Sequence, residues 1–262
     1  MVKVLSVLVL LSLLFSLCSC GNISLHPEEE TNPSPEITQP EETPVEDETP
    51  ADDAPLHSPL YIEGLDVEDV IRYFNEVCLD AEIQYSGNAS LVQKWTTPIL
   101  YYLDGNPTDA DMATLNHFID WLSTVDGLPA FHNVQDPLKA NLQIHFCTQD
   151  DMLAIMGDNY VNMDGAVTFW YWDNAIYEAT ICYRTDLDQT LRNSVILEEI
   201  YNGLGPVQDT DLRPDSIIYS EFTHSQELTE IDELILRLLY HPDIECGMNA
   251  AQCEAVIRQL YY

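Results

Sequence analysis

Two adjacent carboxylates, Glu198 and Glu199, are the residues whose types and spacing come closest to a reactive site in this sequence. Acids buried side by side raise each other's pKa, so one of them could act as a general base near neutral pH. The pair lies on a predicted helix that ends at Gly205-Pro206, a common C-terminal signal. A glutamate pair on a helix is also typical of a solvated surface, and both interpretations stay open here.

The sequence motifs of the common catalytic and nucleotide-binding sites are absent. The patterns H-E-x-x-H, G-x-G-x-x-G, G-x-S-x-G and the phosphate-binding loop do not occur. The five cysteines beyond residue 20 form no C-x-x-C pair, although Cys246 and Cys253 could pair across a short loop. No two histidines share metal-ligand spacing, and we interpret His145 as structural. Three carboxylates that could bind calcium or magnesium follow the glutamate pair: Asp209, Asp211 and Asp215. Acidic residues are, however, frequent throughout the chain.

The elements that must position these residues follow from hydrophobic periodicity and turn signals. Strands are predicted at 95–103, 141–148, 167–172 and 175–183, and helices at 67–79, 108–122, 188–204, 229–240 and 249–261. This order predicts an α/β (α+β) layer fold with a mixed sheet and C-terminal helices. The helix 188–204, which carries the glutamate pair, is called the motif-bearing helix. In the aromatic run Phe169–Trp172, alternate side chains are expected to point into the core, and the outward ones could stack on a sugar or a peptide.

The N-terminus predicts export and a lipid anchor. Residues 1–19 contain one lysine and a 14-residue apolar run that is too short to span a membrane. The run ends in Leu17-Cys18-Ser19, and Cys20 follows. This ending resembles the bacterial lipobox, which implies a lipoprotein signal peptide and lipidation of Cys20. Residues 20–59 are predicted to be an acidic, proline-rich tether without packed structure, because they hold almost no apolar area to bury. Residues 60–262 then form a single globular domain.

Composition excludes one class of partner. The chain has 9 Lys+Arg against 45 Asp+Glu and a formal net charge of -36, so it has no basic surface for nucleic acid. Its acidity favours solubility and repulsion from an anionic envelope, or binding of cations or basic partners.

The segment from Glu198 to Gln208, followed by Ser216-Ile217-Ile218-Tyr219, resembles the metzincin zinc peptidases. The resemblance implies that Glu199 occupies the place of the catalytic glutamate, that Glu198, Asn202 and Gln208 occupy the three ligand positions, and that Ile218 replaces the turn methionine. Together with the run 228–240 and Gly247-Met248, the segment also resembles the bacterial family labelled domain of unknown function 2927, which is grouped with the zincin-like proteins. Amide oxygens are weak zinc ligands, so we expect no zinc and no cofactor, and calcium only as an alternative.

These observations predict a lipid-anchored, outward-facing protein of the bacterial membrane. Its degenerate zincin-like domain is expected to bind a peptide, a glycan or an envelope protein without acting as a zinc peptidase. The alternative is a hydrolase in which Glu199, assisted by Glu198 or Asp209, is the general base, with a non-canonical metal or none. A third possibility is a passive acidic spacer.

Overall fold

The computed structural model describes residues 58–79, 91–220 and 225–262. The predicted signal peptide (1–19), Cys20 and all but the last two residues of the predicted tether (20–59) lie outside the described residues. Within the described part, no helix combines the length and the apolar character needed to cross a membrane.

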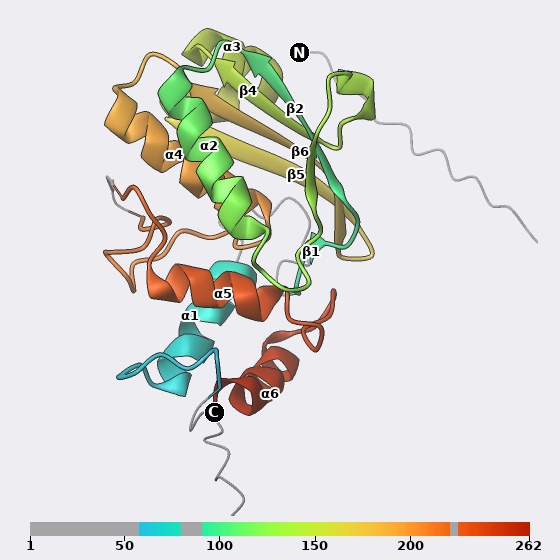
Figure 1. Ribbon diagram of the computed structural model, residues 1–262, viewed down its shortest axis with the longest axis vertical. Coiled ribbons are helices and arrows are strands. Elements are labelled where there is room, and N and C mark those ends of the chain that lie inside the picture. The colour runs from blue at the N-terminus through green and yellow to red at the C-terminus, as the bar shows by residue number, and fades with distance from the viewer. Residues whose placement is uncertain (1–57, 80–90, 221–224) are drawn as a thin grey trace, which may run out of the picture. The chain divides into compact units, whose positions relative to one another are not determined.

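Helices and strands follow one another as in the predicted α/β fold class, which is thereby confirmed (Figure 1). The described helices are α1 (Val67–Leu79), α2 (Asp109–Leu122), α3 (Gln149–Met156), α4 (Gln189–Gly203), α5 (Glu230–Leu239) and α6 (Ala250–Tyr261). The strands are β1 (Lys94–Trp95), β2 (Ile99–Gly105), β3 (Phe131–Asn133), β4 (Leu142–Cys147), β5 (Gly165–Trp172) and β6 (Ala175–Arg184). Two short 3-10 turns complete the described elements: Pro137–Lys139 and Asp158–Tyr160.

One predicted strand is wrong in its extent. The predicted strand 95–103 is divided into β1 and β2, with Thr96, Thr97 and Pro98 between them. Pro98 has no amide hydrogen for a strand ladder, so it breaks the run. Strand β3 and helix α3 were not predicted, since three and eight residues are too few to establish a clear period.

The six strands form one mixed sheet in the order β1-β6-β4-β2-β3, with β5 off this path. Strand β6 pairs with β1 at its first two residues, with β4 further along, and with β5 along most of its length. All of these pairs are parallel except β5 with β6, which run antiparallel as a hairpin. The hairpin turns through Asp173 and Asn174, both with positive φ, as expected for a two-residue turn. Within the described residues β5 pairs with β6 alone, so residues 165–170 present an outer edge that no described strand covers.

The main core lies between one face of the sheet and the helices. In β4 every second residue is buried, and Ile144 and Phe146 are on the same face as Ile181 and Tyr183 of β6. Helices α2 and α4 pack side by side, and α4 contacts β5 and β6 (Figure 1). The opposite face carries a small cluster of buried residues, Met152, Tyr160, Ala166 and Cys182.

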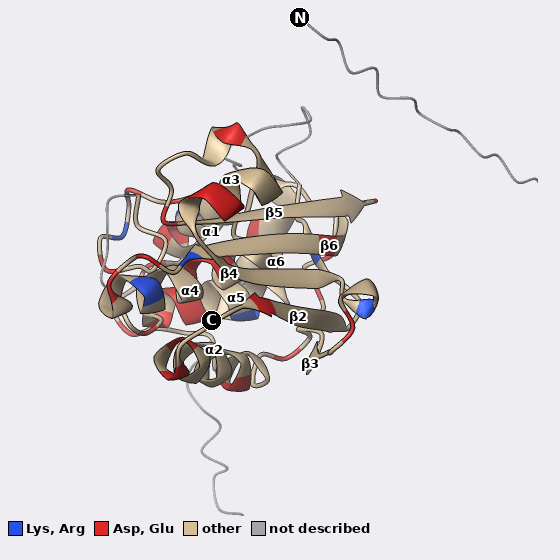
Figure 2. Cartoon of the chain, turned by 90° about the horizontal axis from the view of Figure 1, so that it is seen from above, with Lys and Arg blue, Asp and Glu red and all other residues tan. Residues whose placement is uncertain are grey.

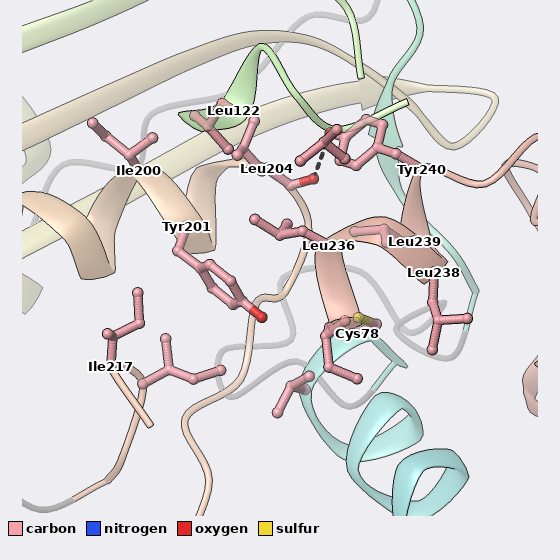
Figure 3. Packing of buried hydrophobic residues seen from close by; sticks show 14 of the residues in the cluster. Cys78, Leu122, Ile200, Tyr201, Leu204, Ile217, Leu236, Leu238, Leu239 and Tyr240 are labelled. Carbon is pink, nitrogen blue, oxygen red and sulfur yellow. Dashed lines mark hydrogen bonds between the residues drawn. The ribbon is translucent and has the colours of Figure 1, made fainter. Parts of the chain in front are cut away.

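The core continues from the sheet into α1, α5 and α6. Figure 3 shows Tyr201 and Leu204 at the end of α4 meeting Leu236 and Tyr240, with Ile217 on the other side of Tyr201. The Tyr240 hydroxyl donates to the Leu204 carbonyl at 2.8 Å. These contacts fix the end of α4, and therefore the segment that follows it, against the rest of the domain.

Candidate acidic site on helix α4

Helix α4 begins and ends where its sequence predicts. The Asp188 carboxylate caps its N-terminus by accepting from the amides of Thr190 and Leu191 at 3.1 and 3.2 Å. At the other end Gly205 has a φ of +127°, and a Cβ there would lie 2.4 Å from the Gln93 carbonyl oxygen. Only glycine fits both conditions, so the helix stops and the chain turns away at this residue.

Both glutamates of α4 are withdrawn from solvent, which contradicts a solvated surface pair. Glu199 is 7% exposed and Glu198 is partly buried. Glu199 lies against the start of β5, where its Oε1 would be 2.7 Å from a Cβ on Gly165. Gly165 therefore makes room for the carboxylate. No motif in the sequence marks Gly165, although a glycine at the start of an aromatic strand often indicates a close approach of another element.

The burial of these acids changes their protonation. Desolvation, followed by the charges of Asp209 and Asp164, raises the pKa of Glu198 to about 8. Desolvation, followed by the charges of Glu198 and Asp209, raises the pKa of Glu199 well above its ordinary range. Near neutral pH the pair is therefore largely protonated, so each carboxyl group can donate a hydrogen bond or a proton.

Asp164 is a further acid near the pair that the sequence analysis did not single out. Its carboxylate lies 3.3 Å from Nη1 of Arg184, whose other nitrogens bind Asp186 at 2.8 and 3.1 Å. This arginine is therefore already engaged by two aspartates. The residue immediately before β5 thus adds negative charge beside α4.

The three ligand positions implied by the metzincin resemblance do not suit zinc. Glu198 is one carboxylate, while Asn202 and Gln208 offer neutral amide oxygens that zinc rarely takes. The side-chain Oδ1 of Asn202 is buried and has no hydrogen-bond partner. Across the described residues, no group of three or more His, Cys, Asp or Glu side chains is placed to hold a metal ion. The residues present thus do not fit the group that the resemblance implies.

The acids after the helix are dispersed rather than gathered. Asp211 is exposed and accepts a hydrogen bond from the Ser220 hydroxyl. Asp215 is bound by Arg213 through two contacts of 3.0 and 2.8 Å. Asp209 is partly buried, and its charge acts on both glutamates. Of the three candidate calcium ligands, only Asp209 is thus connected with the acidic pair.

The segment Ser216–Tyr219 is a buried turn held by an aspartate of α5. The Ser216 hydroxyl donates to Oδ1 of Asp232 at 2.6 Å and accepts from the Tyr73 hydroxyl at 2.9 Å. Ile217 and Ile218 are fully buried. Tyr201 of α4 donates its hydroxyl to the Asp232 carbonyl at 3.0 Å, so one residue joins the turn to the motif-bearing helix.

The remaining candidates take structural or surface positions. His145 binds Asp104 on the neighbouring strand at 2.9 Å, as a structural histidine does. Cys246 and Cys253 are free thiols, so the pairing that their spacing allowed is not formed. Trp170 and Trp172 are 44% and 82% exposed, which leaves outward aromatic side chains on β5.

Comparison with known proteins places the domain in a family. A family model described as "Protein of unknown function (DUF2927)" matches residues 67–259, from the first residue of α1 into the last turns of α6. No curated protein matches the chain.

Proposed function

The chain belongs to the DUF2927 family, and from that premise we propose that it is a lipid-anchored lipoprotein of the bacterial envelope whose zincin-like domain binds an extended peptide without cleaving it. The single observation that carries the proposal is that residues 165–170 of β5 pair, within the described residues, with β6 alone, and that this stretch begins beside the buried Glu199 of α4. An extended chain can add to such an edge through backbone hydrogen bonds, while pockets beside the strand select its side chains.

Three features support a peptide as the occupant of the edge. Strand β5 has the sequence GAVTFWYW, without a charge or a proline, and charges and prolines are the usual means of protecting an edge from pairing. Trp170 and Trp172, near the end of β5, present exposed apolar surface. The acidic residues around α4 favour a basic or neutral peptide over an acidic one.

The donor set argues against peptide cleavage by the metzincin route. Without a good zinc ligand set, no acidified metal-bound water is available for Glu199 to deprotonate. Zinc-dependent proteolysis that is lost in Glu199→Gln would overturn this part of the proposal.

Peptide selection tests the binding proposal. Random octapeptides are selected on the immobilised full-length chain, and the enriched sequences are re-measured after methylation of alternate backbone nitrogens. Strand addition predicts that methylation in one of the two alternating sets abolishes binding and that the other set is tolerated. Failure to enrich any peptide over a surface without protein would contradict the proposal.

The anchor requires its own test, because Cys20 lies outside the described residues. Palmitate should label the wild-type chain in a bacterial host, and Cys20→Ala should remove the label. Retained labelling in that variant would contradict lipidation at Cys20.

The burial of two adjacent acids supports one alternative, a hydrolase in which Glu199 is the general base, assisted by Glu198 or Asp209, at a pH high enough to ionise Glu199. Such an enzyme would turn over a substrate without added zinc and would lose activity in Glu199→Gln. Binding without turnover is the result expected from our proposal.

A further inference from the structure

The small cluster on the sheet face opposite the main core is rich in sulfur. Its buried members are Met152, Tyr160, Ala166 and Cys182, and packed against them are Cys147, Leu153 and Met156. Four of these seven side chains are cysteine or methionine, whereas the main core of the described residues also holds four but is many times larger. Because both residue types also serve as ordinary core residues, the placement of the four sulfurs decides what they can do.

The two cysteines of this cluster lie on neighbouring strands and interact through their thiols. Cys182 of β6 is opposite His145 of β4, so Cys147, two residues further along β4, is on the same face of the sheet. The Cys182 thiol donates a hydrogen bond to the Cys147 sulfur, and both thiols are free. Metal–thiolate bonds are about 2.3 Å long, so two sulfurs that share a metal lie no more than about 4.6 Å apart. The pair can therefore bind one metal ion with little movement of the strands.

Helix α3 adds two thioethers over the same part of the sheet. Met152 and Met156 are one turn apart on one face of α3, and this helix packs against β6. A capping box formed by Thr148 and Asp151 fixes the start of α3 directly after Cys147. One short segment thus holds a thiol and two thioethers close to the thiol of β6.

The four sulfurs combine a buried interior with access from solvent. Met152 and Cys182 are fully buried, whereas Cys147 and Met156 are partly exposed. The Met152 sulfur accepts a long contact of 3.9 Å from the Gln149 amide, which engages its lone pairs only weakly. An ion can therefore enter past the two outer sulfurs and reach the two inner ones.

The donor set selects a soft cation. Thiolate and thioether sulfurs favour Cu(I), while calcium and magnesium take oxygen ligands. Structural zinc sites use four ligands drawn from cysteine, histidine and carboxylate, and no three such side chains converge in the part of the chain that the structure describes. Only with the methionines does this cluster have enough ligands for a metal ion, and thioether ligands favour Cu(I) over zinc.

We propose that Cys147, Cys182, Met152 and Met156 form a binding site for one Cu(I) ion. The thiolates bind the ion as their two protons pass to solvent, and the copper keeps its oxidation state. The site lies between α3 and the sheet, and it is independent of the proposed peptide binding at the edge of β5.

Competition for Cu(I) tests the proposal. The full-length chain is titrated with Cu(I) without oxygen, in the presence of a chromophoric Cu(I) chelator, beside the variant Cys147→Ser/Met152→Leu. The matched control is Cys246→Ser/Met248→Leu, which removes one partly buried thiol and one partly buried thioether outside the cluster. We expect wild type and control to retain one Cu(I) per chain and the cluster variant to bind about 100-fold more weakly or worse, because even outer partners of a metal site contribute about 10–100-fold.

A second variant and a second measurement separate binding from folding. Met152→Leu/Met156→Leu keeps the apolar volume and both thiols, so its metal-free form should unfold near the wild-type temperature. Its affinity for Cu(I) should nevertheless fall about tenfold or more. Cu(I) should raise the thermal midpoint of wild type and control, and raise that of the cluster variant much less.

Three results would overturn the proposal. Wild type that yields all its copper to the chelator has no such site. Copper retained equally by the cluster variant, or lost equally by the control, would show binding by thiols elsewhere in the chain. An unchanged affinity in Met152→Leu/Met156→Leu, or zinc retained as tightly as Cu(I), would contradict a site built with thioethers for a soft cation.

Discussion

Glu199 is an acid kept away from water by the residue opposite it. Because Gly165 has no side chain, α4 can lie close enough to β5 to cover the carboxylate, and that burial holds the pKa of Glu199 above its ordinary range. The protonation of the site therefore depends on a backbone contact as much as on the acids themselves. Two predictions follow at this scale, one for protonation and one for the contact.

The stability of the domain should fall as pH rises from about 4.5 to about 8. The pKa of Glu198 is raised from 4.5 to about 8 and that of Glu199 is raised further, so the folded chain retains protons that the unfolded chain has released. Below pH 4.5 both states bind these protons and the effect disappears. Each group contributes a slope of up to about 1.4 kcal/mol per pH unit to the free energy of unfolding. Urea unfolding at a series of pH values measures this slope.

Matched variants assign that slope to the pair. Glu198→Gln and Glu199→Gln should each flatten the dependence on pH, because the group that releases its proton on unfolding is gone. Glu63→Gln, which removes an exposed acid, should leave it unchanged. A wild-type stability that rises between pH 5 and 8 would show that the pair is ionised in the folded protein.

Adding a methyl group at Gly165 should destabilise the fold. The Cβ of Gly165→Ala would lie 2.4 Å from Cγ1 of Val195 and 2.7 Å from Oε1 of Glu199, so these side chains or α4 itself must shift. Overpacking of this kind costs about 1–3 kcal/mol. The matched control is Gly203→Ala, whose Cβ would meet its nearest side-chain atom at 3.4 Å, and thermal unfolding should distinguish the two variants. Equal stabilities would mean that the α4–β5 contact is loose.

At the scale of elements, α2 and α4 are joined by a buried ion pair. Asp111 is fully buried and binds Nη2 of Arg192, and it also accepts from Gln189 at 2.7 Å. Arg192 donates its second nitrogen to the Thr185 carbonyl at 3.1 Å. The pair thus fixes the start of the motif-bearing helix to the start of α2 and to the end of β6.

Breaking this pair should be far more damaging than breaking an exposed one. Arg192→Met leaves an unpaired buried carboxylate and should lower the free energy of unfolding by about 3–5 kcal/mol. Arg72→Gln removes an exposed pair with Asp69, whose side chains are 63% and 55% exposed, and should change it by less than about 1 kcal/mol. Chemical denaturation of both variants checks the comparison, and similar losses would mean that the buried pair is compensated elsewhere.

Sequence patterns predicted the long elements well because those elements carry their own signals. Helix α1 has the predicted bounds because it is strongly amphipathic, and α4 begins and ends within one residue of prediction because Asp188 caps its start and Gly205 follows its end. The short elements β3 and α3 depend on tertiary contacts and could not be predicted in this way.

The acidic site was only partly predictable for a related reason. Glu198 and Glu199 are adjacent in sequence and could be singled out, whereas Asp164 and Gly165 reach them only through the pairing of β5 with β6. The orphan oxygen of Asn202 is likewise a property of packing. No local pattern of residues encodes these contacts.

At the scale of the whole molecule, excess negative charge dominates. The chain has a formal net charge of -36, and Figure 2 shows acidic residues spread over helices and loops while basic ones are few. Self-repulsion of this kind destabilises the folded state and is screened by salt. The thermal midpoint of unfolding at pH 7 should therefore rise between 10 and 150 mM NaCl, and scanning calorimetry would show it. A midpoint that falls with salt would mean that attractive ion pairs outweigh the repulsion.

The last helix closes the fold onto its first residues. Tyr261 donates its hydroxyl to the carbonyls of Ile62 and Leu65 at 3.2 and 2.8 Å, and Arg258 binds Glu68 at 2.5 and 2.7 Å. A chain synthesised from its N-terminus cannot make these contacts until α6 has appeared, 190 to 199 residues after the partners that α6 binds. Until then, the surface of α1 that packs against α6 stays uncovered by it.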